Sequence, residues 1–390
     1  MKRPFLLILA AQIALSMVTT AHAQGTVSDV VGFLVTNQAV PTADFEKDRQ
    51  AAEAARLTIS NALLVDLTSM PLATASSGFL YRFNPQLGTV ERATESFGGF
   101  FVERALTPGR GRASFGVSTA TAGFDRLDGS SLHDGTLVTV ANRFRDEAAP
   151  FDTESLTLRI RSSTMTVFGS VGITDRIEIG AAVPFARLTL DGERINVYRG
   201  QTFTQASGTA AASGLADIAL RAKVNVLSIA GGGIALAGEV RLPTGDAANL
   251  LGAGKSSFRV MGIGSIERGR LAVHGNAALV TGGISSEFDI GGAVSAAVHP
   301  RVTLSAETLI RQVSELHPID LVSAPHPTLA GVDTLRLSAG QGAETVAIAV
   351  TGLKWNVSRT VVLGGHLSWS LTHSGLTAPI TPTLAFEYAF

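Results

Sequence analysis

The stretch LADIALRAKVNVLSIAGGGIALAGEVRLP, residues 215–243, alternates between two kinds of side chain. From 216 to 226 every even position is aliphatic, whereas the odd positions include Asp217, Arg221 and Lys223. After three glycines at 231–233 the same alternation resumes. A period of two is that of a β-strand, and a glycine-rich turn between two such runs is typical of a hairpin. The stretch therefore predicts two paired strands, each with an aliphatic and a charged face.

The same alternation recurs to the end of the chain. The mean hydropathy is +0.28, yet beyond the first 23 residues no apolar run approaches the length of a membrane-spanning helix. Strands that pair into a closed barrel can cross a membrane without such a helix. We therefore expect an all-β protein, a transmembrane antiparallel β-barrel of about twelve strands over residues 112–390. The strands are expected to begin near Arg112, Glu154, Asp175, Leu215, Gly232, Ser256, Gly269, Glu287, Arg301, Glu344, Thr360 and Ala378.

The connections between these strands alternate in length. Short ones are expected at 172–175, 228–233, 267–269, 299–300 and 357–359. Long loops are expected at 125–153, 196–214, 245–255 and 315–343. Two breaks, at 282–286 and 374–377, are short where a long loop is expected. Short turns at one end and longer loops at the other are typical of outer-membrane barrels.

Residues 1–23 have the three parts of a secretory signal peptide. Lys2 and Arg3 precede an apolar run, and Ala21-His22-Ala23 is a small-x-small cleavage site. Without Lys2 and Arg3, 29 of the 31 basic residues remain against 32 acidic ones, a net charge of −3. No basic patch indicates nucleic-acid binding. The chain has no cysteine, and we expect an exported protein in the outer membrane of a Gram-negative bacterium, embedded among its lipids.

Residues 24–111 differ from the rest of the chain. Asp44 can cap a helix whose apolar residues recur from Phe45 to Leu67, before Pro71. Short extended pieces follow, among them a hairpin formed by 79–83 and 89–93. The segment is too short to form a large core of its own. We expect one helix and a role as a plug or as a periplasmic cap of the barrel.

The charged face of the strands is expected to line the lumen, because an arginine or lysine facing lipid at mid-depth costs about 2–4 kcal/mol. Two interpretations of the lumenal charges remain open. Neighbouring strands pair them into a rigid wall, or they form a polar path or a docking surface for the plug. The lumen-lining candidates are Arg159, Arg161, Glu178, Asp217, Arg221, Lys223, Glu239, Arg241, Arg259, His274, Asp289, Glu307 and His366.

Several other patterns are weaker. NLLGAGKSS has Asn249 where a phosphate-binding loop requires glycine. His366 and Ser368 share the inner face of a strand without an acidic partner, and His317 and His326 lack a carboxylate cluster. We therefore expect no enzyme activity, no metal and no cofactor. Pro184 predicts a bulge, a strand end or a lateral gap.

The last residues, LAFEYAF at 384–390, place aromatic and aliphatic side chains on one face and end in Phe390. This is typical of the C-terminal strand that the barrel-insertion machinery of the outer membrane recognises. Tyr388, Trp369 and Trp355 suit the aromatic girdle at a membrane boundary.

Three segments carry a family resemblance: ITDRIEIGAAVPF at 173–185, LADIALRAK at 215–223 and RLPTGDAANLLGAGKSSF at 241–258. They resemble outer-membrane proteins of the meta-pathway phenol-degradation type, relatives of the long-chain fatty acid transporter channels. The resemblance covers roughly residues 76–390, and RLPTGD at 241–246 is its most specific part. It implies a channel for passive uptake of small hydrophobic or aromatic compounds and identifies no binding residue. The alternatives are a lipase-like outer-membrane enzyme and a structural or adhesive barrel.

Overall fold

Twelve antiparallel strands close into a barrel, as the sequence predicts. The computed structural model describes residues 25–69, 81–84, 89–92, 94–229, 231–340, 342–358 and 360–390. The barrel closes because β7 pairs with both β3 and β8. Each predicted strand start lies within three residues of an observed one. The barrel strands are β3 (Ala113–Phe124), β7 (Asp152–Gly172), β8 (Ile177–Tyr198), β10 (Ile218–Ile229), β11 (Gly232–Leu242), β12 (Ser257–Arg268), β13 (Leu271–Gly282), β14 (Glu287–His299), β15 (Val302–Val313), β18 (Glu344–Ser358), β19 (Val361–Ser370) and β21 (Thr381–Ala389).

The aliphatic face of the strands points outward. Leu220, Val260 and Leu384 are 44%, 64% and 67% exposed, while the alternating residues are mostly buried. A continuous apolar exterior of this kind suits lipid. Among the described helices, none combines the length and the hydropathy that a membrane span needs.

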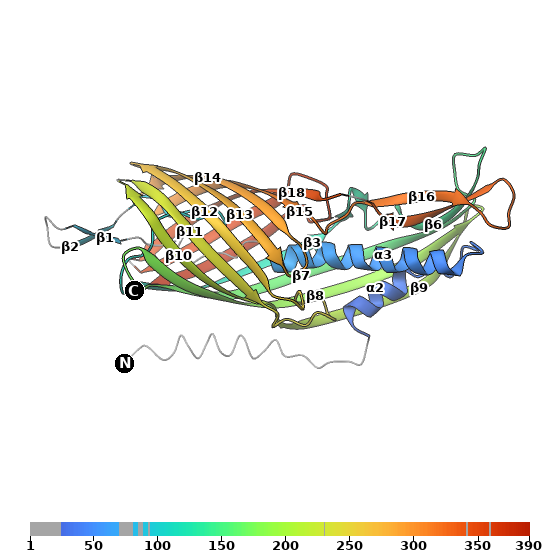
Figure 1. Cartoon of the computed structure of the whole chain (residues 1–390), viewed down its shortest axis with the longest axis horizontal. Helices are drawn as coiled ribbons and strands as arrows, with labels where there is room; N and C mark the ends of the chain where they lie inside the picture. The colour runs from blue at the N-terminus through green and yellow to red at the C-terminus, as the bar shows by residue number, and fades with distance from the viewer. Residues whose placement is uncertain are drawn as a thin grey trace.

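The two ends of the barrel differ. At the end that carries the C-terminus, consecutive strands join through short turns, such as the one between β12 and β13 (Figure 1, left). At the other end the chain makes its long connections. Because outer-membrane barrels have short turns on the periplasmic side, we assign the long-connection end to the exterior of the cell.

A six-stranded sheet continues beyond the outer rim. The strands β7 and β8 have 21 and 22 residues, more than the roughly 9–11 that cross a membrane. Their outer halves belong to a sheet of order β16-β17-β6-β7-β8-β9. The added strands are β6 (Leu137–Phe144), β9 (Gln201–Leu215), β16 (Ile319–Pro325) and β17 (Val332–Ala339). The expectation of plain loops over much of 125–153, 196–214 and 315–343 was therefore wrong. The short strands β4 (Arg126–Leu127), β5 (Ser130–Ser131) and β20 (Leu376–Thr377) form a separate small sheet.

Pro184 lies where one edge of β8 changes its partner. Residues 177–182 of β8 pair with β10, and residues 185–198 pair with β9. The Pro184 carbonyl accepts a hydrogen bond from the Ala216 N–H at 2.8 Å, and its other edge pairs with β7 without interruption. The missing N–H of proline therefore falls where this edge of β8 changes its partner strand, and the wall stays continuous on the β7 side.

Two helices pack against the extension (Figure 1). Helix α2 (Val27–Val35) begins with a capping box of Thr26 and Asp29, and α3 (Phe45–Leu64) begins at Asp44, whose carboxylate accepts the Lys47 N–H. A π-helical turn η1 (Val65–Ser69) continues α3. The expected helix is α3 with η1, and the expectation of a single helix missed α2. The signal peptide and Pro71 lie outside the described residues.

The helices bury aliphatic side chains of both segments in one hydrophobic core. Leu34 of α2 and Leu63 of α3 lie in the same cluster as Leu158 of β7 and Leu188 of β8. The predicted hairpin near residue 85 is present, as β1 (Tyr81–Asn84) paired with β2 (Thr89–Arg92) beyond the short-turn end.

Candidate functional site

An extended segment, residues 94–110, lies inside the barrel and forms a plug. The Glu307 carboxylate accepts the N–H groups of Phe101 at 2.9 Å and Val102 at 2.8 Å, and also that of Phe100. From the next strand, Lys354 Nζ donates to the Gly98 carbonyl at 2.8 Å and lies 4.7 Å from the centroid of the Phe100 ring. Charge-assisted hydrogen bonds of this kind are the strongest that proteins make. The plug is therefore fixed by two strands through its backbone.

Glycine is required where the plug approaches Glu307. A Cβ at Gly99 would lie 2.8 Å from Glu307 Oε1 and 2.8 Å from the Val102 carbonyl oxygen. Any larger residue would push the backbone away from the carboxylate.

The opposite wall holds the other end of the plug. Arg221 forms an ion pair with Glu103. Lys223 pairs with Glu178 at 2.9 Å and reaches the Arg104 carbonyl at 3.4 Å. Ala105 is held at its carbonyl by Asn225, at 2.9 Å, and at its N–H by Ser265, at 2.8 Å. These contacts match the docking-surface interpretation for Arg221, Lys223 and Glu307.

The remaining charged candidates match the paired-wall interpretation. The pairs are Arg241–Glu239 at 2.9 Å and Arg259–Asp289 at 3.0 Å. In a further pair, Arg311–Glu287 at 2.7 Å, the alternation also predicts an inward Arg311, whereas Glu287 was not predicted. His274 Nδ1 lies 3.0 Å from Ser265 Oγ. Asp217 has a different role, since its carboxylate accepts the N–H groups of Gly245 at 3.0 Å and Ala253 at 2.8 Å. It thereby holds together the two ends of the outer-loop segment 245–253, which begins within RLPTGD.

Arg159 and Arg161 do not line the lumen. Both are exposed on the outer face of β7, where the even-numbered residues face inward. The prediction assumed that the whole strand lies in lipid, but β7 continues into the extension. A charge on its outer face there meets water or headgroups and carries no mid-membrane penalty.

A cavity of about 170 Å³ remains between the plug and the end of the helices. Its floor includes Phe101 of the plug, and its roof includes Val65, Asp66 and Leu67 of η1. Its wall consists mainly of small, uncharged side chains. The wall residues include Ser118, Ala120, Ala122, Ser162, Thr164, Thr166, Val346, Ile348, His366, Ser368, Ser370, Thr381 and Thr383.

His366 is the candidate that lines this cavity. It is 5% exposed, and its ring centroid lies 4.4 Å from that of Phe100 and 5.2 Å from that of Phe101. Neither ring nitrogen has a hydrogen-bond partner among the described residues. The Ser368 hydroxyl donates instead to the Thr381 carbonyl at 3.4 Å, so this geometry does not form a serine–histidine pair.

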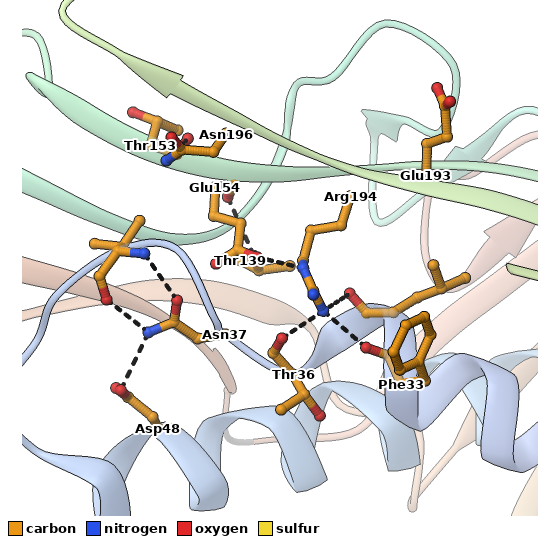
Figure 2. Close-up of polar contacts among 12 residues, drawn as sticks. Phe33, Thr36, Asn37, Asp48, Thr139, Thr153, Glu154, Glu193, Arg194 and Asn196 are labelled. Carbon is orange, nitrogen blue, oxygen red and sulfur yellow. Dashed lines mark hydrogen bonds and ion pairs between the residues drawn. The ribbon is translucent and has the colours of Figure 1, made fainter. Parts of the chain in front are cut away.

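The two helices are docked on the extension through a cluster of polar contacts (Figure 2). Arg194 is fully buried, pairs with Glu154 at 2.5 Å, and donates to the Phe33 carbonyl at 2.8 Å and to the carbonyls of Leu34 and Thr36. It therefore satisfies the C-terminal carbonyls of α2. Burial raises the pKa of Glu154, and the Arg194 guanidinium opposes that shift.

Further contacts hold the link between the helices. Asn37 Nδ2 donates to Asp48 at 3.1 Å, and Asp48 pairs with Arg336 of β17 at 2.8 Å. The two loop histidines form hydrogen bonds with backbone carbonyl groups. His317 Nδ1 bonds to the Gly342 carbonyl, and His326 Nε2 bonds to the Pro41 carbonyl. The described part of the chain contains no group of three metal-binding side chains.

Sequence reasoning found the charges and missed the uncharged wall. The sequence does contain a signal for this wall: the inward positions of β7 are Ser162, Thr164 and Thr166, and those of β3 are Ser118, Ala120 and Ala122. Small inward residues leave space in a barrel of this size. Phe101 could not have been placed, since nothing in the sequence aligns the plug with the strands.

No family model matches the sequence, and no curated protein matches it. Among solved structures, the chain is similar to an outer membrane channel from Pseudomonas putida F1, with 11% identity over 73% of this chain and 98% of that one, at a TM-score of 0.47. The toluene transporter TbuX of Ralstonia pickettii gives 10% identity, 72% and 90% coverage and a TM-score of 0.31. The translocator domain of the autotransporter NalP from Neisseria meningitidis has 12% identity over 72% of this chain and 89% of that one, at a TM-score of 0.32. At these values the likeness concerns the barrel fold alone.

Proposed function

We propose that this protein is a passive outer-membrane channel for small hydrophobic or aromatic compounds. The observation that supports this is the lumenal cavity of about 170 Å³. For comparison, an engineered protein cavity of about 150 Å³ with an apolar lining binds benzene. The cavity therefore has the size of a single aromatic ring with a small substituent.

The chemistry of the cavity favours a neutral solute. Apolar contacts come from Phe101, Leu67 and Ile348, and the hydroxyl groups of the wall carry no charge. Two charged side chains line the cavity: Arg311 pairs with Glu287, and burial raises the pKa of the Asp66 carboxyl to about 6. An anion entering the cavity would lose hydration, and the arginine that lines the cavity is already paired with Glu287.

His366 adds a polar contact for the solute. A neutral histidine ring has one donor and one acceptor nitrogen, and both nitrogens of His366 are buried without a partner among the described residues. A hydroxyl group on an aromatic ring would satisfy one of them. This favours hydroxylated over plain aromatic hydrocarbons.

We also propose the route by which the chain reaches the membrane. A signal peptide cleaved after Ala23 directs export, and the insertion machinery recognises β21 with Phe390. Leu384 and Phe390 are 67% and 62% exposed on the outer face, where such a signal is accessible. The partners are then outer-membrane lipids, this machinery and the small solute.

The test compares two phenylalanine substitutions on adjacent residues of β3. Ala120 faces the cavity, between Thr164 and Thr383, whereas Thr119 is exposed on the lipid side. We expect Ala120→Phe to lower uptake of radiolabelled phenol and toluene at least fivefold, and Thr119→Phe to leave it unchanged. Uptake is measured in cells with an intact outer membrane and matched amounts of folded barrel. Equal uptake by both variants and the wild type would contradict the proposed function.

A further inference from the structure

The lipid-facing surface of β8 ends at a defined residue. Its outward side chains from Ile177 through Ile179 to Phe185 are apolar or small and mostly exposed. Nine residues span about 27 Å along a strand, or about 21 Å along the membrane normal at a tilt of 40°. This approaches the roughly 25 Å height of the apolar band of outer-membrane barrels. The outer lipid headgroups therefore begin just beyond Phe185.

The next outward residue on β8 is Arg187. Residue pairing places Met165 opposite Phe185 and Ser163 opposite Arg187, so the following outward residue of β7, Arg161, lies diagonally beside Arg187. Diagonal neighbours of this kind are within reach of one another when the side chains are long. The strand register thus makes Arg161 and Arg187 diagonal neighbours on the outer face, beyond the apolar residues Met165 and Phe185.

The surroundings of this arginine pair are small and uncharged. Arg161 lies between Gly123 of β3 and Thr189 of β8, and Arg187 lies between Ser163 of β7 and Ser213 of β9. Both arginines are exposed, and neither forms an ion pair with any residue that the structure describes. The acidic residues of the same face begin further out.

The nearest acidic residue, Asp191, is the other diagonal neighbour of Arg161, but no ion pair joins it to either arginine among the described residues. Asp191 lies opposite Arg159, two outward positions beyond Arg187, and Glu193 follows. Two like charges side by side without a counter-ion are unfavourable. Ion pairs neutralise the arginines of the lumen, from Arg221 to Arg311. The charge of Arg161 and Arg187 is therefore available to an external anion at the depth of the headgroups.

We propose that Arg161 and Arg187 bind a phosphate group of an outer-leaflet glycolipid, the lipid A part of lipopolysaccharide. Two guanidinium groups can hold one phosphate through parallel hydrogen bonds. The acyl chains of the same lipid would lie along Phe185 and Met165, directly below. The proposal does not depend on what the channel transports.

The test uses native mass spectrometry of the purified full-length barrel titrated with lipid A. The variant is Arg161→Gln/Arg187→Gln, and the matched control is Arg268→Gln/Arg270→Gln, which removes two exposed arginines at the short-turn end. We expect the lipid A concentration for half-saturation to rise at least fivefold in the first variant and to stay unchanged in the control. Heat-modifiable electrophoresis verifies that each variant is folded.

Two further probes identify the chemical group. Lipid A lacking one phosphate should bind more weakly than the intact lipid to the wild type. Inorganic phosphate should compete only at far higher concentration, because it lacks the acyl chains. Equal binding of lipid A by the arginine variant and the wild type would overturn the proposal, as would equal loss in the control. Equal competition by inorganic phosphate would show a simple anion site in place of a lipid site.

Discussion

The lumen has two unlike halves. On the side of β8 and β10 to β15, the inward residues are largely charged, and they are used in ion pairs and in contacts to the plug. On the side of β3, β7, β19 and β21, the inward residues are mostly serine, threonine and alanine, and a cavity is left there. The difference indicates that the charges hold the plug in place, whereas the uncharged half provides room for a solute.

This division also explains how a charged lumen can serve an apolar solute. A buried charge without a partner is costly, so charged residues in a narrow barrel must be satisfied locally. The pairs and the plug satisfy them on one side. The solute then meets mainly hydroxyl groups, aliphatic residues and the rings of Phe101 and His366.

The largest effect is expected from releasing the plug on the charged side. Glu307→Ala removes the acceptor of three plug N–H groups, and hydrogen bonds to a charged group contribute about 1.5–3 kcal/mol each. We expect single-channel conductance for small ions in planar bilayers to rise severalfold. Ser305→Ala is the control, because Ser305 faces the lumen on the same strand and bonds only Ser295 among the described residues. Unchanged conductance in Glu307→Ala would mean that the plug does not depend on this carboxylate.

A charge placed in the uncharged half should disturb transport next most strongly. Thr164 lines the cavity. An aspartate at this position would be a buried charge without a partner, and such a charge costs several kcal/mol of stability. We expect Thr164→Asp to lower uptake of toluene about tenfold, and the isosteric Thr164→Val to retain it. If both variants transport equally well, the absence of charge in this half has no bearing on transport.

A smaller effect is expected at His366, which sharpens the comparison within the uncharged half. The net contribution of one hydrogen bond is about 0.5–1.5 kcal/mol, which corresponds to a factor of roughly 2 to 10 in a binding constant. His366→Phe should lower the ratio of phenol to toluene uptake by that factor, and His366→Gln should restore part of it. An unchanged ratio would show that His366 does not recognise the solute, and the channel proposal itself would still stand.

Local alternation was enough to predict the barrel, because lipid imposes the same period of two on every strand. It also located the ion-pair residues, since charges avoid lipid. It failed at Arg159 and Arg161, where β7 leaves the membrane, and nothing in a local pattern reports membrane depth.

The helix α2 was missed because it has only nine residues, and its stability comes from packing and from Arg194, which is distant in sequence. The cavity depends on where the plug crosses the lumen, through contacts separated by more than 200 residues such as Phe101–Glu307. Such contacts leave no signal in a single sequence.

The central claim is that the uncharged half of the lumen holds an aromatic solute. The most direct measurement is anomalous diffraction from crystals of the protein soaked with 4-bromophenol. We expect a bromine peak inside the cavity bounded by Phe101, Ser118 and His366, weakened in crystals of Ala120→Phe. Bromine found only outside the barrel, with the lumenal cavity empty at saturating solute, would contradict the account.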